Sequence, residues 1–133
     1  RVFIEDCYNA SPDSMRASLN MFREYPCKGR RFALLGDMLE LGSIEEEAHR
    51  QVGRWAAQSG LAHLVTLGSA SRFAADEAEK AGLAVTRCQT HEEAAQALKS
   101  RMAPGDALLA KGSRGMRLEQ VLQMLYAEAQ TND

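Results

Sequence analysis

The sequence has 133 residues, of which 45% are hydrophobic and 26% are charged, and its formal net charge is −2. These values are typical of a single globular domain and exclude a chain that is mostly disordered. A net charge of −2 gives no strongly basic surface that would attract nucleic acid or an anionic membrane. No apolar run in the sequence is long enough to cross a bilayer.

Short apolar runs rich in β-branched residues alternate with helical patterns along the whole chain. These runs predict five strands, at Val2–Glu5, Phe32–Leu35, His63–Leu67, Ala84–Arg87 and Ala107–Ala110. Each strand is followed by a helical pattern, which gives five β-α pairs. We therefore predict one α/β domain over residues 1–133, with a Rossmann-like, doubly wound, mostly parallel sheet and helices on both faces.

Local signals predict where three of the helices begin. Ser11 places a capping residue before Pro12, which suits the first position of a helix. The segments Ser43–Glu46 and Thr90–Glu93 both fit the capping box, in which a hydroxyl and a carboxylate each accept a hydrogen bond from the other residue's backbone. After the second start, Ile44, Ala48, Val52, Trp55 and Ala56 form an apolar stripe that we expect to be buried.

The cysteines and histidines do not form a recognisable metal or disulfide pattern. They are few and widely spaced: Cys7, Cys27 and Cys88, and His49, His63 and His91. We expect reduced thiols, a cytoplasmic protein and no metal site built from this chain alone. The chain also begins without methionine, which we interpret as a segment of a longer protein.

Three turns that follow predicted strands carry most of the polar chemistry. They are Asp6–Ser14, Leu35–Ser43 and Ala110–Glu119. In a doubly wound sheet the carboxyl ends of the strands meet at one edge, so we expect the three turns to lie together.

The side chains in these turns suit a nucleotide and an anionic substrate. Asp6 can accept hydrogen bonds from a ribose diol, while Tyr8 and Asn9 offer a flat face and an amide. Lys111 and Arg114 supply positive charge for phosphate or carboxylate.

Simpler interpretations of the same residues stay open. Asp6 and Ser11 can act only as turn and helix caps, and the basic residues can be solvated. Asp37 and Glu40 can belong to a plain acidic loop. The P-loop order GxxxxGK[ST] is absent, so we do not expect the domain to bind ATP tightly by itself.

Taken together, "DCYNASPDSM", "LLGDMLELG" followed by "EEEAHRQVG", and "LLAKGSRGMRLE" resemble the C-terminal domain of the Mur ligases. The resemblance runs from Val2 to about Tyr126, and it is strongest to the members that add D-alanyl-D-alanine to UDP-N-acetylmuramoyl-tripeptide. One position departs from the family's usual Tyr-Asn-Ala-Asn-Pro, because Ser11 replaces the second Asn.

This resemblance implies an ATP-dependent ligase of peptidoglycan precursor synthesis that works through an acyl phosphate. It implies that UDP-binding and central ATPase domains precede this segment and that ATP and Mg²⁺ are held mainly by the central domain. The isolated domain is then expected to be inactive. The expected partners are the missing domains of the same protein and the two substrates, and neither nucleic acid nor a membrane is expected as a partner.

The resemblance also assigns site residues, without a certain catalytic residue or any metal ligand. ATP is assigned to Asp6, Tyr8 and Asn9; D-alanyl-D-alanine to Ser11, Lys111, Ser113 and Arg114; and a closure loop to Asp37, Glu40 and His49.

Two other functions are compatible with the predicted fold. One is a stand-alone nucleotide-binding or regulatory module, and the other is a flavodoxin-like receiver domain. A receiver needs an acidic cluster at the first strand end and a lysine after the last strand, which Glu5, Asp6 and Lys111 match only loosely. Fold alone does not separate these functions.

Overall fold

The computed structural model of the chain describes residues 2–7 and 9–132. Its five strands form one sheet in the order β1-β5-β2-β3-β4, and every neighbouring pair is parallel. The predicted parallel sheet is confirmed, and all five predicted strands are present: β1 (Val2–Asp6), β2 (Arg31–Gly36), β3 (His63–Leu67), β4 (Val85–Cys88) and β5 (Ala107–Lys111).

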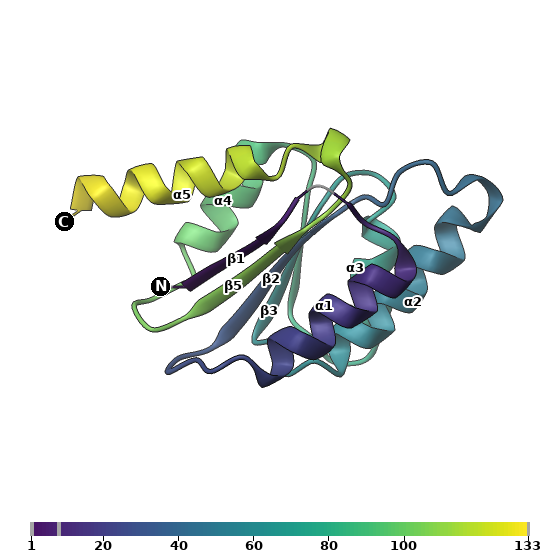
Figure 1. Cartoon of the computed structure of the whole chain (residues 1–133), viewed down its shortest axis with the longest axis horizontal. Coiled ribbons are helices and arrows are strands. Elements are labelled where there is room, and N and C mark those ends of the chain that lie inside the picture. The colour runs from purple at the N-terminus through teal and green to yellow at the C-terminus, as the bar shows by residue number, and fades with distance from the viewer. Residues whose placement is uncertain (1, 8, 133) are drawn as a thin grey trace.

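Helices cover both faces of this sheet, as Figure 1 shows. One face carries α1 (Pro12–Glu24), α2 (Glu45–Ala57) and α3 (Arg72–Lys80). The other carries α4 (His91–Lys99) and α5 (Glu119–Asn132). Every residue of β3 and β5 is buried, because both strands lie inside the sheet and are covered on both faces.

The position of β5 creates a reversal in the winding of the sheet. This strand lies between β1 and β2, but the helix that follows it packs on the face opposite to α1 and α2. Open α/β sheets bind ligands at such switch points, outside the carboxyl ends of the strands. The fold therefore places the candidate site at the ends of β1, β5 and β2.

Two of the three predicted helix starts are confirmed, and one is wrong. Ser11 caps α1 in a reciprocal box with Ser14, and Thr90 forms a capping box with Glu93. Ser43 instead lies within the short 3₁₀-helix η1 (Gly42–Ile44), and α2 begins after it without a side-chain cap. The 3₁₀ turn occupies the place where the capping hydroxyl was expected.

The apolar stripe predicted for α2 is also only partly buried. Ala48, Val52 and Ala56 are in the core and Trp55 packs against it, but Ile44 is 56% exposed. Ile44 belongs to the 3₁₀ turn rather than to α2, so it does not follow the face of that helix.

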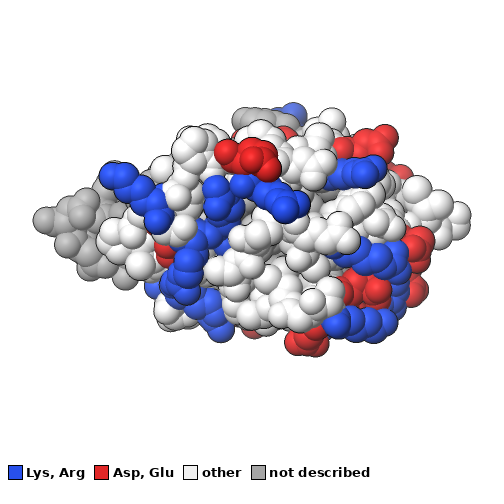
Figure 2. All heavy atoms as spheres, turned by 90° about the horizontal axis from the view of Figure 1, so that it is seen from below, with Lys and Arg blue, Asp and Glu red and all other residues white. Residues whose placement is uncertain are grey.

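Ion pairs join the outer surfaces of α2 and α3. Arg50 and Arg54 of α2 both reach Glu77 of α3, with N–O distances of 2.8 and 3.3 Å. Figure 2, which views the molecule from the side of α1, shows basic and acidic side chains interspersed on that face.

Candidate functional site

The three polar turns lie together at the carboxyl edge of the sheet, as predicted. They follow β1, β2 and β5, which are neighbours with β5 in the middle. The turn after β5 therefore contacts both of the others, and it is the centre of the candidate site.

Two glycines allow the turns after β2 and β5 to approach closely. A Cβ atom added at Gly112 would lie 3.1 Å from the Cα of Gly36 and 2.9 Å from Cδ1 of Leu118. A larger residue at Gly112 would push the two turns apart, which explains the small residue at this point.

The turn after β5 contacts the turn after β1 through a buried lysine. Lys111 is 1% exposed, and its Nζ contacts Oδ2 of Asp6 and donates to the carbonyl oxygen of Asn9 at 3.1 Å. The side chain of Asp6 remains 41% exposed, so its carboxylate is still accessible from the solvent side.

The same turn contacts the turn after β2 through Ser113. The backbone N–H of Leu39 donates to Oγ of Ser113 at 2.8 Å, and the N–H of Ser113 donates to the carbonyl of Asp37 at 3.1 Å. Ser113 was predicted to contact the dipeptide, and its hydroxyl keeps a proton that can be donated to a ligand.

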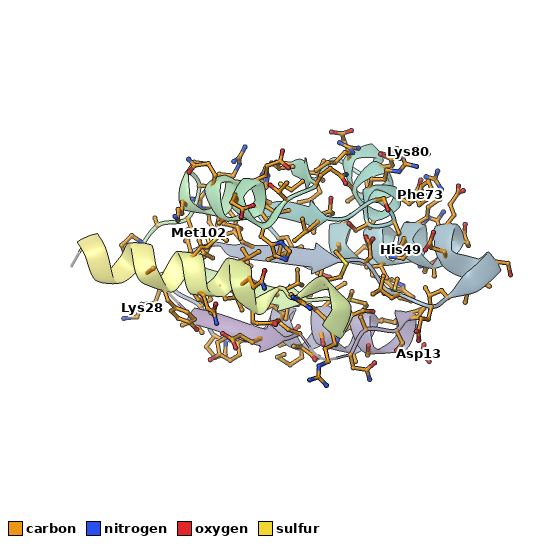
Figure 3. All side chains as sticks on the ribbon, turned by 90° about the horizontal axis from the view of Figure 1, so that it is seen from above. Asp13, Lys28, His49, Phe73, Lys80 and Met102 are labelled. Atoms are coloured by element: carbon orange, nitrogen blue, oxygen red, sulfur yellow. The ribbon has the colours of Figure 1, made fainter. Side chains whose placement is uncertain are left out.

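Two of the three residues predicted to form a closure loop hold the turn after β2 from inside. The Asp37 carboxylate is buried and accepts from the backbone N–H of Ser71 at 2.7 Å. Nε2 of His49 accepts from the N–H of Met38 at 3.0 Å, and Nδ1 lies 2.7 Å from the carbonyl of Glu45. These partners assign the proton of neutral His49 to Nδ1. Figure 3 shows His49 near this edge of the sheet.

The third closure-loop residue, Glu40, differs from the other two. It is exposed and has a φ of 63°, a conformation that non-glycine residues rarely adopt. Leu39 beside it is 41% exposed and Leu41 is half-buried. The tip of this turn therefore presents both charged and apolar groups to the solvent.

The remaining predicted site residues occupy the rim. Arg114 is exposed at the start of the 3₁₀-helix η2 (Arg114–Met116), and Asn9 is exposed in the turn after β1. The hydroxyl of Ser11 accepts from the N–H of Ser14 at 3.2 Å, so its first role is to cap α1. Tyr8 lies outside the described residues.

Sequence reasoning did not assign two residues that stabilise this edge. Nε2 of His91, the first residue of α4, lies 2.8 Å from the carbonyl of Met116, and Ser71 supplies the N–H that Asp37 binds. Neither contact has a local sequence signal, because both partners come from other β-α units.

Cys7, which directly follows Asp6, is not a nucleophile in this arrangement. Burial, together with the negative charges of Glu119, Glu5 and Asp6, raises the pKa of its thiol to about 11. The thiol is therefore protonated at neutral pH and acts as a core residue.

The described part of the chain offers neither a cluster of metal ligands nor a membrane-spanning helix. Among residues 2–7 and 9–132, no three His, Cys, Asp or Glu side chains form a group that could hold a metal ion. None of the described helices has the length and apolar character needed to cross a membrane.

Comparison with known proteins identifies relatives of this site and fold. The family described as "Mur ligase, glutamate ligase domain" matches residues 1–114. A UDP-N-acetylmuramoyl-tripeptide--D-alanyl-D-alanine ligase of Bacillus subtilis is 36% identical over 124 residues, which cover 92% of this chain and 27% of that protein. The ligase of the same name from Synechocystis is 34% identical, over 98% of this chain and 29% of its own length.

Solved structures agree with the sequence relatives. A MurF ligase of Thermotoga maritima in complex with ADP superimposes with a TM-score of 0.81 and 26% identity, over 98% of this chain and 29% of that one. A MurF of Acinetobacter baumannii gives a TM-score of 0.79 and 30% identity, over 91% of this chain and 27% of that one. The chain thus spans less than a third of the length of these relatives, and it belongs to the Mur ligase family, within the glutamate ligase domain of that family.

Proposed function

We propose that this chain is one domain of an ATP-dependent ligase that joins D-alanyl-D-alanine to UDP-N-acetylmuramoyl-tripeptide. The observation that carries the proposal is that the three turns with the family's motifs meet at one sheet edge. The names of the relatives support the substrates, and the ADP in the Thermotoga maritima structure supports a nucleotide.

The proposed reaction activates a carboxylate, which is a poor acyl donor because oxide is a poor leaving group. The tripeptide carboxylate attacks the γ-phosphorus of ATP, which releases ADP and gives an acyl phosphate. The dipeptide amine then attacks the acyl carbon, and phosphate leaves as the amide forms. The protein contributes positioning, charge neutralisation and exclusion of water from the acyl phosphate.

In this proposal the carboxyl edge is one wall of a shared site. Asp6 accepts hydrogen bonds from the ribose, and Tyr8 and Asn9 are assigned to the phosphates of ATP. Ser113 and Arg114 bind the carboxylate of the dipeptide, since a guanidinium matches a carboxylate with two parallel hydrogen bonds. The turn at Asp37–Leu41 approaches the other domains when the site closes.

The other wall belongs to the parts of the full-length protein that this chain does not span. We propose that they include the UDP-binding domain and an ATPase domain that holds the phosphates and Mg²⁺. No step of the reaction is assigned to a metal ligand of this chain. The proposed enzyme acts on soluble cytoplasmic precursors.

Phosphate release by the full-length protein tests this function. With ATP and the UDP-linked tripeptide, phosphate release is expected to depend on D-alanyl-D-alanine, and the amide product should appear in equal amount. A stand-alone nucleotide-binding module would show no such dependence. Release that is stimulated equally by other amino acids or dipeptides would contradict the proposed substrate.

A further inference from the structure

We propose that Lys111 is a positioning residue that holds Asp6 for the nucleotide, and that it does not itself bind the dipeptide. The sequence assigned Lys111 to the dipeptide together with Arg114. The structure gives these two basic residues different surroundings, because Arg114 is exposed whereas Lys111 is 1% exposed.

The ammonium of Lys111 is directed towards the end of β1 and the turn after it, rather than towards the turn after β5. Lys111 is the last residue of β5 and pairs in register with Asp6, the last residue of β1. Its Nζ contacts Oδ2 of Asp6 and donates to the carbonyl of Asn9 at 3.1 Å. Both contacts are therefore made with the turn after β1, which is the one proposed to bind ATP.

Burial makes these contacts difficult to exchange. An ammonium taken out of water is costly unless it is paired, and removing one partner of a buried pair leaves the other charge uncompensated. To reach a dipeptide carboxylate, Lys111 would have to give up both acceptors and leave the interior. Arg114 is already exposed at the rim, so it can meet the same carboxylate without leaving the interior.

The pairing also distinguishes the two oxygens of Asp6. Both contacts that the described residues make with this carboxylate go to Oδ2, from Lys111 and, at 3.5 Å, from the hydroxyl of Ser18. The carboxylate is thereby held in one orientation while 41% of the Asp6 side chain stays exposed. We infer that Oδ1 is the oxygen that accepts a ribose hydroxyl.

The inference rests on the proposed function in one respect, the binding of a nucleotide ribose by Asp6. It adds that Lys111 acts through Asp6, so that loss of either residue has the same effect on ribose recognition. Its second contact, with the carbonyl of Asn9, lies in the same turn as Asp6, so both contacts of Lys111 serve the nucleotide side.

Titration calorimetry on the full-length enzyme tests this role. It measures the affinity for ADP and for the ADP analogue that lacks both ribose hydroxyls, and the ratio of the two affinities reports recognition of the ribose. The variants are Lys111→Met, Asp6→Asn and the double variant. Lys28→Met is the matched control, since Lys28 is exposed and lies towards the opposite end of the sheet (Figure 3). Replacing lysine by methionine removes the charge and keeps an unbranched side chain.

Wild type and Lys28→Met are expected to bind ADP about tenfold more tightly than the analogue, as for a hydrogen bond to a charged acceptor. In Lys111→Met, Asp6→Asn and the double variant, this ratio is expected to fall to about twofold or less, with no further loss in the double variant. The KM for D-alanyl-D-alanine in Lys111→Met should stay within about twofold of wild type.

Two results would overturn the proposal. One is a Lys111→Met variant that keeps the wild-type preference for ADP, and the other is a variant whose dipeptide KM rises while that preference is unchanged. If Lys111→Met does not fold, Lys111→Gln takes its place, because it removes the charge and keeps a polar end that can donate to the Asn9 carbonyl. A folded Lys111→Gln variant that keeps the wild-type preference for ADP over the analogue contradicts the role.

The two proposals can fail separately. If the wild-type enzyme shows no phosphate release that depends on D-alanyl-D-alanine, the proposed reaction is wrong. The ADP titrations do not require that reaction, so they still test whether Lys111 positions Asp6.

Discussion

Single residues stabilise the carboxyl edge by satisfying buried polar groups across the turns. The side chains of Asp37, His49 and Lys111 are buried, and each has a partner from a different segment. A buried polar group without a partner costs more than its hydrogen bond contributes, so these contacts specify one arrangement of the turns. Asn9 and Arg114 are instead exposed at the rim, where a ligand can reach them from the solvent side.

Arg114 is the rim residue expected to select the dipeptide. In the full-length enzyme, Arg114→Ala should weaken use of D-alanyl-D-alanine by roughly 2–4 kcal/mol, as for a lost partner in a closed, desolvated charge pair. Arg114→Lys should also be costly, because lysine keeps the charge but loses the bidentate fork. Steady-state kinetics with each substrate varied separately measure this. If the variants use ATP less well and D-alanyl-D-alanine as well as wild type does, Arg114 contacts phosphate instead.

Asp106 is expected to make the stability of the domain depend on pH. Its carboxylate is 3% exposed and accepts from the backbone N–H groups of Arg30 and Ala103, both at 2.8 Å. Burial disfavours the charged form, but these two N–H groups and the Arg30 guanidinium outweigh it and hold the pKa of Asp106 below its ordinary value.

The lowered pKa of Asp106 fixes the direction in which the stability of the domain changes with pH. The stabilisation is present above the unfolded pKa of about 3.9 and is lost as the pH falls through the folded pKa. Asp106→Asn should lower the free energy of unfolding at neutral pH by about 1–3 kcal/mol, because its amide cannot accept from both N–H groups. Urea unfolding at neutral and acidic pH measures this, and the difference from wild type should shrink in acid. A constant difference would exclude the charge as the cause.

At the scale of elements, the close packing of α2 on α3 depends on a glycine in a helix. A Cβ atom added at Gly53 would lie 2.1 Å from the carbonyl oxygen of Ala74, which belongs to the backbone of α3. The ion pairs of Arg50 and Arg54 with Glu77 span the same two helices. Gly53 thus lets the helices approach, although glycine is a poor helix former.

Gly53→Ala should therefore destabilise the domain. An exposed helical glycine changed to alanine ordinarily gains about 0.8–1 kcal/mol, but overpacking against a backbone costs about 1–3 kcal/mol and should exceed it. Ala17→Gly, at an exposed site in α1, calibrates the ordinary propensity term in the same protein. Denaturant unfolding of both variants measures the free energies of unfolding, from which the helix-propensity gain and the overpacking cost are separated. A Gly53→Ala variant more stable than wild type would mean that α2 and α3 can move apart freely.

At the scale of the whole molecule, the domain holds only part of the proposed site. The chain spans 27% of the Bacillus subtilis ligase and 29% of the Synechocystis ligase, and its sequence lacks a P-loop. We expect the isolated domain to bind ATP weakly or not at all, since few groups on one wall can hold the phosphates. Calorimetry measures this, with the full-length protein as the control. Micromolar affinity of the isolated domain would favour the stand-alone nucleotide-binding module.

The sequence by itself determined the elements and the family of this protein. The five strands, the caps at Ser11 and Thr90 and the presence of polar turns after strands are local signals, which depend on residues a few positions apart. The exception is Ser43, where a 3₁₀ turn replaced the expected cap. The three turn motifs were specific enough to identify the Mur ligase family.

Only the tertiary structure decided which polar side chains meet. Lys111 pairs with Asp6 across 105 residues, Ser113 binds Leu39 across 74, and Asp37 binds Ser71 across 34. The first two pairs depend on the insertion of β5 between β1 and β2, and the third depends on the pairing of β2 with β3, and no local pattern specifies either. Strand order is set by the burial of both sheet faces at once, which is a property of the whole chain. This order buries Lys111, which the sequence had assigned to the dipeptide.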